Sequence, residues 1–474
     1  MKHIYRKLQI TVFTLIFLVS ASSCKKYFDL EQNPNLVQDP PLSAQLSTVT
    51  QKTALNTQRV AGFTAYFTQY LANPGAGGAT DTYDIVDYTS TWDAIYFAMA
   101  DIYDMKARAA EQGATDYTGV ASILMAYHLS LVSDVWGSAP YADAFGGNTL
   151  TPAYDSEEVL YTQIGNLLDE GIADLRKTDS RIEISGANDL IHGGDKKSWV
   201  KTAYALKARL LNKISKKAEY DPAAVLSAID SAYTGSADDA QMSVFLGLNP
   251  WAAVAQSNEQ LVLGGWLSEQ LIDAMNGKTY GVVDPRLPKI TDPTATGTFV
   301  GTPNGAGNQG SGSNTTKDEC YISRNSPATS DKAPLVIVSF AELKFVEAEA
   351  ALRSGNRTRA YAAYQSGIGA SMDKLTVAAA AKGTYLINPA VAVGASALTL
   401  DLIFKEKYIA TYLNPEAWVD ARRYDYKYKD FKLPVNAVLP TFIRRADYPV
   451  GERTKNGANV PPVTALSDKL WWDQ

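Results

Sequence analysis

The sequence predicts a mostly α-helical protein, and three observations support this fold class. Apolar residues recur at three- and four-residue spacing over long stretches, which is the pattern of amphipathic helices. Glycine, asparagine and proline separate these stretches. The helices follow one another in pairs that recur at roughly 35 to 45 residues, as in tetratricopeptide-type hairpins, although no pair is a clean repeat copy.

The clearest helix pair is expected after residue 339. Its first helix, about 340–352, has an apolar stripe on one side, and its charged residues, including Glu347 and Glu349, are expected to face solvent on the other. Gly355 can adopt the left-handed conformation that ends a helix. The second helix is expected at about 358–372, packed against the first.

The same spacing predicts helices on both sides of this pair. Those in the first half are expected at about 43–71, 92–111, 117–135, 156–175, 196–216 and 222–233, and one in the second half at about 398–412. The helix at 196–216 is expected to turn its Lys and Arg side chains outward. Residues 443–474, which contain several prolines, are expected to form a non-helical tail.

Residues 235–333 differ in composition from the helical segments. Glycine, asparagine, threonine and serine dominate there, and residues 301–317 are nearly low-complexity. A long irregular stretch inside a compact protein is usually functional or disordered. We therefore expect a loop-rich insertion at about 235–333 within one large domain, residues 42–474.

The N-terminus has the features of a bacterial lipoprotein leader. A basic start is followed by the apolar run Ile10–Val19, which is too short to span a bilayer but has the length of a signal-peptide core. The small residues Ser20–Ser23 precede Cys24. We expect a signal peptide at 1–23, a lipid on Cys24 and a tether at 24–41; the alternative is an ordinary secretory signal with a chance cysteine.

Charge and motif content argue against several functions. The chain carries a formal charge of −6 and has no Lys/Arg-rich run, so nucleic acid is not an expected partner. Gly305–Gly310 matches a dinucleotide-binding pattern in letters only, and Gly277–Thr279 resembles a phosphate loop that lacks its first glycine. His128 and His192 are too far apart for a local metal motif. We expect no catalytic residues, no metal and no cofactor.

Cysteine content argues against a disulfide framework. If Cys24 carries lipid, Cys320 has no partner in the chain. A buried or idle thiol is then the expected state of Cys320.

A set of short motifs occurs in order along the whole chain. They are Cys24-Lys-Lys-Tyr-Phe-Asp29 with Asn33-Pro34, Asp134–Tyr141, Trp199–Arg209, Asp284-Pro-Arg-Leu287, Ala341–Ala350, Pro415–Arg423, Arg444-Arg445, Tyr448-Pro449 and Trp471-Trp472-Asp473. Together they resemble the SusD/RagB family of outer-membrane lipoproteins, and the SusD-like branch of Bacteroidota in particular. Most of these motifs are signatures of fold and packing, so they do not name ligand residues.

The resemblance implies a fold and a function. The implied fold has about four tetratricopeptide-like hairpins, with helix pairs within about 43–233 and 339–372, supporting an irregular ligand face. The implied protein is attached to the outer membrane through the lipid on Cys24 and faces the cell exterior. It would bind oligosaccharides, or sometimes peptides or other nutrients, and deliver them to a SusC-like TonB-dependent transporter.

Loop aromatics are the candidate ligand contacts, because sugar binding needs flat aromatic faces together with polar groups that satisfy hydroxyls. The candidates beside glycine-rich breaks or within the irregular middle are Asp81, Tyr83, Trp251, Trp266 and Tyr321. For each, packing on the scaffold is the competing interpretation. Trp136, Trp199 and Trp418 lie inside the motifs and are expected in the core.

Two functions of other classes remain as alternatives. A surface glycoside hydrolase would need a pair of carboxylates at the ligand face, and no such pair is apparent in the sequence. A helical adaptor would bind only proteins and leave the middle loops without a ligand. We favour the nutrient-binding lipoprotein.

Overall fold

The computed structural model describes residues 3–6, 39–259, 264–310 and 317–474. Leu42–Gln474 forms one compact unit, and Met1–Pro41 forms a second. Cys24 and most of the predicted tether lie outside the described residues.

Helices dominate the larger unit. They are α2 (Leu42–Phe67), α3 (Thr89–Glu111), α4 (Thr115–Trp136), α5 (Glu157–Leu175), α6 (Lys196–Lys213), α7 (Pro222–Asp230), α8 (Pro250–Glu259), α9 (Glu269–Met275), α10 (Leu287–Ile290), α11 (Phe340–Arg353), α12 (Arg357–Lys374), α13 (Ala379–Leu386), α14 (Leu400–Ala410), α15 (Glu416–Arg423) and α16 (Val450–Lys455). Short 3₁₀ turns occur at η1 (Ser236–Asp238) and η3 (Trp471–Asp473).

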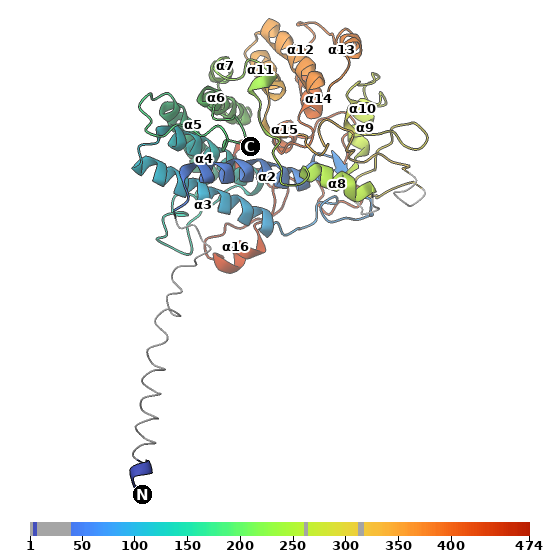
Figure 1. Ribbon diagram of the computed structural model, residues 1–474. Helices are drawn as coiled ribbons and strands as arrows, with labels where there is room; N and C mark the ends of the chain where they lie inside the picture. Colours follow the sequence, from blue (N-terminus) through green and yellow to red (C-terminus); the bar gives the residue numbers. More distant parts are fainter. Residues whose placement is uncertain (1–2, 7–38, 260–263, 311–316) are drawn as a thin grey trace. The chain divides into compact units, whose positions relative to one another are not determined.

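The packing of these helices confirms the predicted fold class. Helix α2 packs against α3, α4 against α5, α6 against α7, and α11 against α12, which gives four pairs of successive helices. In Figure 1, α3 lies below α2 and α5, α6 and α7 lie above it, while the loop-rich segment with α8, α9 and α10 lies towards the right-hand end of α2. The helices thus form a scaffold that supports the loops.

Sheet structure is minimal among the described residues. Strand β1 (Leu71–Ala72) pairs antiparallel with β3 (Trp266–Leu267), and β2 (Ala240–Met242) pairs antiparallel with β4 (Leu335–Val338). Each two-stranded pair joins the middle segment to a helical part of the chain. The first pair fixes the loop that follows α2 against the segment that precedes α9.

The central hairpin forms as predicted, but its charged face does not. The Ser339 hydroxyl caps α11 by accepting from the Glu342 amide at 3.2 Å, and Gly355 has φ +83° at the turn. Glu347 and Glu349 were expected in solvent, and both are buried. The prediction that this face is solvent-exposed was wrong. The residue pattern of one helix does not show which other helices pack on it, and here other helices of the scaffold cover the charged face.

The prediction that the Lys and Arg side chains of α6 face outward was also only partly correct. Arg209 and Lys213 are buried. The Arg209 guanidinium donates to both carboxylate oxygens of Glu342, at 2.8 and 2.6 Å, and the Lys213 ammonium lies 2.6 Å from Asp134. Long cationic side chains enter the interior here because a carboxylate from another helix meets each of them.

The tail and the middle contain more helix than expected. Residues 443–474 include α16 and η3, and the loop-rich middle includes α8, α9 and α10. These elements are short, so they have too few turns to show a clear apolar period in the sequence. Apart from these helices, η1, β2 and β3, the described residues of the middle are irregular.

The three tryptophans assigned to the core lie there. Trp136, Trp199 and Trp418 are almost completely buried. Among the described residues, one helix, α4, is long and apolar enough to cross a membrane, and 94% of its most apolar window is buried inside the protein. Helix α4 is therefore a buried helix of the core.

Candidate functional site

A buried carboxylate, Asp81, organises the loop-rich face. Its Oδ2 accepts from the backbone amides of Gly305 at 2.6 Å and Asn73 at 3.1 Å, and its Oδ1 accepts from the Asn304 side-chain amide. Burial raises the pKa of Asp81, and these three hydrogen bonds act against that rise. The Asn304 amide also donates to Leu71 O at 2.9 Å. Asp81 therefore holds a distant loop against the end of β1.

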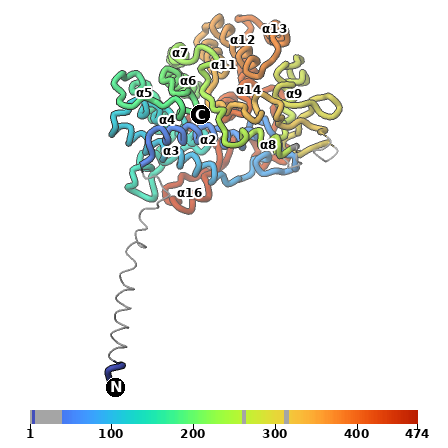
Figure 2. The backbone as a smooth tube through the Cα atoms, viewed as in Figure 1, coloured from blue at the N-terminus to red at the C-terminus, as the bar shows by residue number. Residues whose placement is uncertain are grey.

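Three loops meet around this carboxylate. In Figure 2 the light-blue segment after α2 runs beside the yellow loops of the middle segment. The Gly77 amide donates to Gly305 O at 3.0 Å, and the Val438 amide donates to Thr82 O at 2.8 Å. Gly305 has φ +78°, and a Cβ there would collide with Val435 O, so only glycine fits.

A polar cleft of about 380 Å³ opens beside these loops. Its volume is within the range of small-molecule sites, roughly 300–1,000 Å³. Its apolar lining consists of Pro303, Leu433, Pro434 and Val435. The polar and charged lining consists of Gln69, Ser268, Glu269, Gln270, Asp273, Lys278, Thr279, Asn304, Asp430 and Lys432. Amides, hydroxyls and carboxylates of this kind can exchange hydrogen bonds with the hydroxyls of a sugar.

Helix α9 and the turn after it supply three of the five charged residues in the cleft, which are Glu269, Asp273 and Lys278. The Lys278 ammonium lies 2.6 Å from Asp273 Oδ2 and 3.2 Å from Glu269 Oε1. The hydrogen bond to Asp273 raises the pKa of Lys278. The Ser268 hydroxyl caps α9 and also bonds Asn304 Oδ1 at 2.6 Å. The cleft is thus connected to the Asp81 network through Asn304.

Four of the five predicted ligand residues belong to this loop-rich part of the molecule. Asp81, Tyr83 and Trp266 are completely buried, and Tyr321 is half-buried. Trp266 pairs with Ala72 in the β1–β3 sheet, and its ring lies 6.1 Å from that of Tyr321. Because Asp81, Tyr83 and Trp266 are buried, they support the loops from inside the protein. Tyr321 remains partly accessible to solvent.

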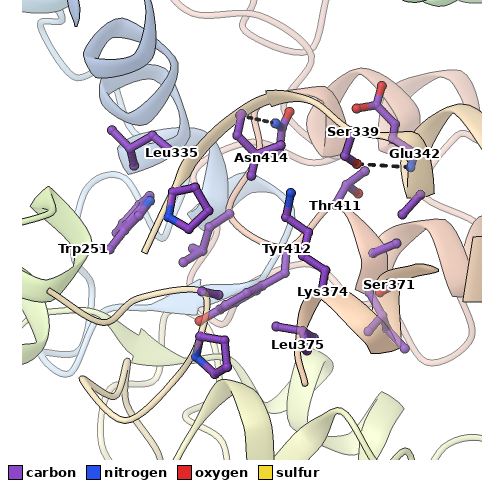
Figure 3. Close-up of a pocket in the computed structure, with 18 of the residues that line it drawn as sticks. Trp251, Leu335, Ser339, Glu342, Ser371, Lys374, Leu375, Thr411, Tyr412 and Asn414 are labelled. Atoms are coloured by element: carbon purple, nitrogen blue, oxygen red, sulfur yellow. Dashed lines mark hydrogen bonds between the residues drawn. The ribbon is translucent and has the colours of Figure 1, made fainter. Parts of the chain in front are cut away.

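Trp251 lies elsewhere. It is the second residue of α8 and lines a separate, more apolar pocket (Figure 3) that shares no lining residue with the polar cleft. Its side chain is 4% exposed. The structure therefore does not bring the two predicted tryptophans, Trp251 and Trp266, into one site.

The remaining candidate reactive groups occupy structural positions. His128 Nδ1 donates to Leu124 O at 2.9 Å inside α4, and His192 Nε2 bonds the Thr202 hydroxyl at 2.7 Å. Burial raises the pKa of the Cys320 thiol to about 11. Within the described part of the chain, no three His, Cys, Asp or Glu side chains gather as metal ligands would.

The family comparison covers most of the chain. Residues 34–449 match the SusD-like_2 family, whose members are described as starch-binding and associating with the outer membrane. The chain belongs to this family of binding proteins. The search of curated proteins found no significant match.

Solved structures agree with this fold. The chain is similar to a SusD/RagB family protein from Bacteroides thetaiotaomicron, with 21% identity, a TM-score of 0.74, and coverage of 92% of this chain and 99% of that one. It is also similar to a chitin-binding SusD homologue from Flavobacterium johnsoniae, with 23% identity, a TM-score of 0.75, and coverage of 92% and 97%. A SusD homologue from Bacteroides uniformis gives 20% identity, a TM-score of 0.75, and coverage of 92% and 100%.

Sequence reasoning did not find the charged residues of the cleft. Gly277-Lys278-Thr279 was considered only as a phosphate-loop fragment, yet Lys278 joins two carboxylates there. A local signal was present, since Ser268 followed by Glu269 is a typical helix start. The partners on residues 430–435 are brought in by tertiary folding, which no local pattern reports.

Proposed function

We propose that this chain is a cell-surface nutrient-binding lipoprotein that captures an oligosaccharide and delivers it to a SusC-like TonB-dependent transporter of the outer membrane. Its membership of a starch-binding, outer-membrane-associated family, over residues 34–449, carries the proposal. In this proposal residues 1–23 are a signal peptide, residues 24–41 a tether lipidated at Cys24, and residues 42–474 the binding domain.

The polar cleft is the proposed glycan site. Its lining combines hydrogen-bonding amides and carboxylates with apolar side chains. This mixture suits a sugar ring, which is polar at its edges and apolar on its faces. Tyr321 is the predicted aromatic contact with an exposed edge near this face. Asp81, Tyr83 and Trp266 would act by holding the loops in place.

A titration tests the capture role. The chain without its first 24 residues is titrated with starch-type and chitin-type oligosaccharides and with peptides, and the heat of binding is followed while the ligand is checked for cleavage. Binding of an intact oligosaccharide is the expected result. Peptide binding alone would replace the glycan by another nutrient, and no binding at all would favour the protein-binding adaptor.

The cleavage check matters because the cleft contains carboxylates. Glu269 and Asp273 lie on one helix with Lys278 between them. A hydrolase would use such a pair as acid and base. Release of shorter products that is lost on Glu269→Gln and Asp273→Asn substitution would contradict the binding role.

A further inference from the structure

The segment at residues 429–432 forms one wall of the polar cleft, and Asp430 and Lys432 line the cleft from it. Asp430 has a left-handed backbone, with φ +61°, and so does Gln69, another lining residue, with φ +54°. A positive φ is uncommon outside glycine and costs free energy, and such residues cluster at functional sites. This wall of the cleft is therefore a candidate for ligand contact.

Three hydrogen bonds hold the 429–432 segment in place. The Gln69 side-chain amide donates to Lys432 O at 2.6 Å, and the Gln270 side-chain amide donates to Lys429 O at 3.2 Å. The Lys429 ammonium donates to Thr279 O at 2.7 Å. Both ends of the segment are therefore fixed to other parts of the cleft.

An aromatic cluster anchors the middle of the segment. The Phe431 ring packs against Tyr426, Tyr428 and Phe442, with ring centres 5.6, 5.7 and 5.4 Å apart. The Phe431 amide also donates to Tyr428 O at 3.2 Å. Because Phe431 follows Asp430 directly in the chain, the Asp430 backbone is held in position before any ligand binds. A preformed wall loses little conformational entropy on binding.

Asp430 supplies the unpaired carboxylate of the cleft. Glu269 and Asp273 both pair with the Lys278 ammonium, at 3.2 and 2.6 Å. Asp430 is exposed, and its carboxylate forms no hydrogen bond or ion pair with any described residue. An ionised carboxylate only accepts hydrogen bonds, and its two oxygens can accept from two neighbouring donors at once. Asp430 is thus available to a ligand that carries such donors.

Two buried side chains of the cleft also have oxygens without a partner. Gln270 and Thr279 are 8% and 5% exposed. The Gln270 Oε1 and the Thr279 hydroxyl form no hydrogen bond with any residue in the described ranges. Both residues line the cleft, and neither oxygen is completely enclosed, so a ligand can reach them. Unsatisfied polar groups of this kind are unfavourable, and ligand hydroxyls would satisfy them.

The unpaired charges of the wall balance each other. The Lys432 ammonium, two residues after Asp430, forms no ion pair or hydrogen bond within the described part of the chain. An acidic or a basic ligand would be attracted by one of these charges and repelled by the other. An uncharged ligand rich in hydroxyls can donate to Asp430 and accept from Lys432. The wall therefore suits a neutral sugar.

We propose that Asp430 is a specificity-determining contact of the cleft, and that its carboxylate accepts hydrogen bonds from two adjacent hydroxyl groups of one sugar ring. This inference rests on the proposed function, since it takes the cleft to be the glycan site. In a methyl glucoside, the hydroxyl on carbon 3 belongs to every adjacent pair of ring hydroxyls. Its removal abolishes all such pairs, whereas removal of the hydroxyl on carbon 6 abolishes none.

Three methyl glucosides test this contact. Methyl α-glucoside is compared with its 3-deoxy and 6-deoxy derivatives, because the matched family is described as starch-binding and starch is built from α-glucose. We expect the 3-deoxy sugar to bind about tenfold more weakly, since hydrogen bonds to an ionised oxygen are the strong ones, and the 6-deoxy sugar to bind about as well as the parent. Binding is measured by ligand-observed NMR, in competition with maltotetraose, on the chain without its first 24 residues, which retains the compact unit Leu42–Gln474.

Asp430→Asn isolates the carboxylate. Asparagine accepts a left-handed backbone readily, and it removes the charge and one acceptor. Affinity for methyl α-glucoside should fall about tenfold, and the preference over the 3-deoxy sugar should nearly disappear. The melting temperature should not change, because no described residue bonds the Asp430 side chain. A purely structural role would not alter the preference between the two sugars.

Asp179→Asn is the matched control, since Asp179 is an exposed carboxylate outside the cleft. This variant should bind the three glucosides as the unmodified chain does. The inference is overturned if the unmodified chain binds the three alike or binds none of them. It is also overturned if folded Asp430→Asn keeps the preference, or if Asp179→Asn loses it to the same extent.

Maltotetraose binding keeps this inference apart from the proposed function. If the unmodified chain binds maltotetraose but does not distinguish the glucosides, the capture role stands and only the role of Asp430 is lost. If no saccharide binds in the titration, the proposed function and this inference are overturned together.

Discussion

The helical scaffold and the loop-rich face are held together by different interactions. In the scaffold, buried guanidinium groups pair with buried carboxylates; Arg423 pairs with Glu349 of α11 and with Asp420 of its own helix, α15. At the loop-rich face, one carboxylate, Asp81, accepts hydrogen bonds from neutral amides of distant loops. Ion pairs thus hold the helices together, and hydrogen bonds from amide groups to one carboxylate hold the loops together.

Two of the motifs that carry the family resemblance supply these buried ion pairs of the scaffold. Asp284-Pro-Arg-Leu287 supplies the buried Arg286–Asp284 pair, at 2.6 Å, and Arg286 also pairs with Glu406. Pro415–Arg423 supplies Arg423 and its partner Asp420. These motifs hold the scaffold, so they are informative about fold and silent about the ligand.

Removing the guanidinium of Arg423 should have the largest effect. Burial alone would raise the pKa of Glu349, and Arg423, with Arg353 and Lys407, lowers it far below its usual range. Arg423→Met leaves Glu349 and Asp420 buried with less compensation. We expect a loss of about 3–5 kcal/mol in the free energy of unfolding, measured by urea denaturation.

A surface arginine provides the matched control. Arg453 is exposed and pairs with Asp447 at the surface of the molecule. Arg453→Met should cost less than about 1 kcal/mol, because water screens the pair. Equal losses in the two variants would show that burial does not set the strength of these pairs.

Acid should weaken the scaffold through His128. Burial lowers the pKa of His128 to about 4; the bond to Leu124 O opposes this, and Lys52 adds to it. The unfolded chain then binds a proton near pH 6.5 that the folded chain does not bind until about pH 4. Stability from this group is therefore present above pH 6.5 and is lost as pH falls towards 4.

The full size of this effect is on the order of 3 kcal/mol, from the difference between the two pKa values. His128→Gln removes the titrating group and should flatten the decline in urea midpoint between pH 6.5 and 4.5. Burial raises the pKa of Glu416 to about 7, which changes stability in the opposite direction over this range. The Glu416 contribution is the same in the variant and in the unmodified chain, so it cancels when the two are compared. Identical dependence of the urea midpoint on pH in both would show that His128 does not cause the decline.

Asp81→Asn tests the loop-rich face. Asparagine has nearly the same shape as aspartate. Its NH₂ group, however, would face an N–H donor at a position where the carboxylate oxygen of Asp81 accepts a hydrogen bond. We expect a local loss of about 1–3 kcal/mol, seen as faster hydrogen exchange at the Gly305 and Asn73 amides. Oligosaccharide affinity should fall as the loops beside the cleft loosen.

Asp84, an exposed carboxylate three residues along the same loop, is the control for this variant. Within the described ranges, its Oδ1 accepts from the neighbouring Ile85 amide and from no distant loop. Asp84→Asn should leave exchange at Gly305 and Asn73 unchanged. If both variants behave alike, the position of Asp81 at the meeting point of the loops has no special importance.

The sequence was informative where the cause of structure is local. Helix periodicity predicted α5 and α7, and the motifs identified the family. Local pattern could not show that Glu349 is buried, because Arg423 reaches it from another helix. Nor could it show that Trp266 lies in a small sheet with residues almost two hundred positions earlier.

The smallest effect on stability is expected at Lys278, and it separates binding from folding. Its side chain is 65% exposed and pairs with Asp273 and Glu269 in the cleft. Lys278→Met should change the melting temperature little, since such pairs contribute below about 1 kcal/mol. It removes a hydrogen-bond donor from the cleft, so oligosaccharide affinity should fall about two- to tenfold.

Lys382→Met is the matched variant outside the cleft, because Lys382 forms a similar surface pair with Asp373 beside α13. It should leave both stability and oligosaccharide affinity nearly unchanged. A fall in affinity at Lys278 alone would attribute ligand binding to the cleft and stability to the scaffold. If both lysine variants bind like the unmodified chain, the glycan site lies away from α9, and Tyr321 becomes the next residue to substitute.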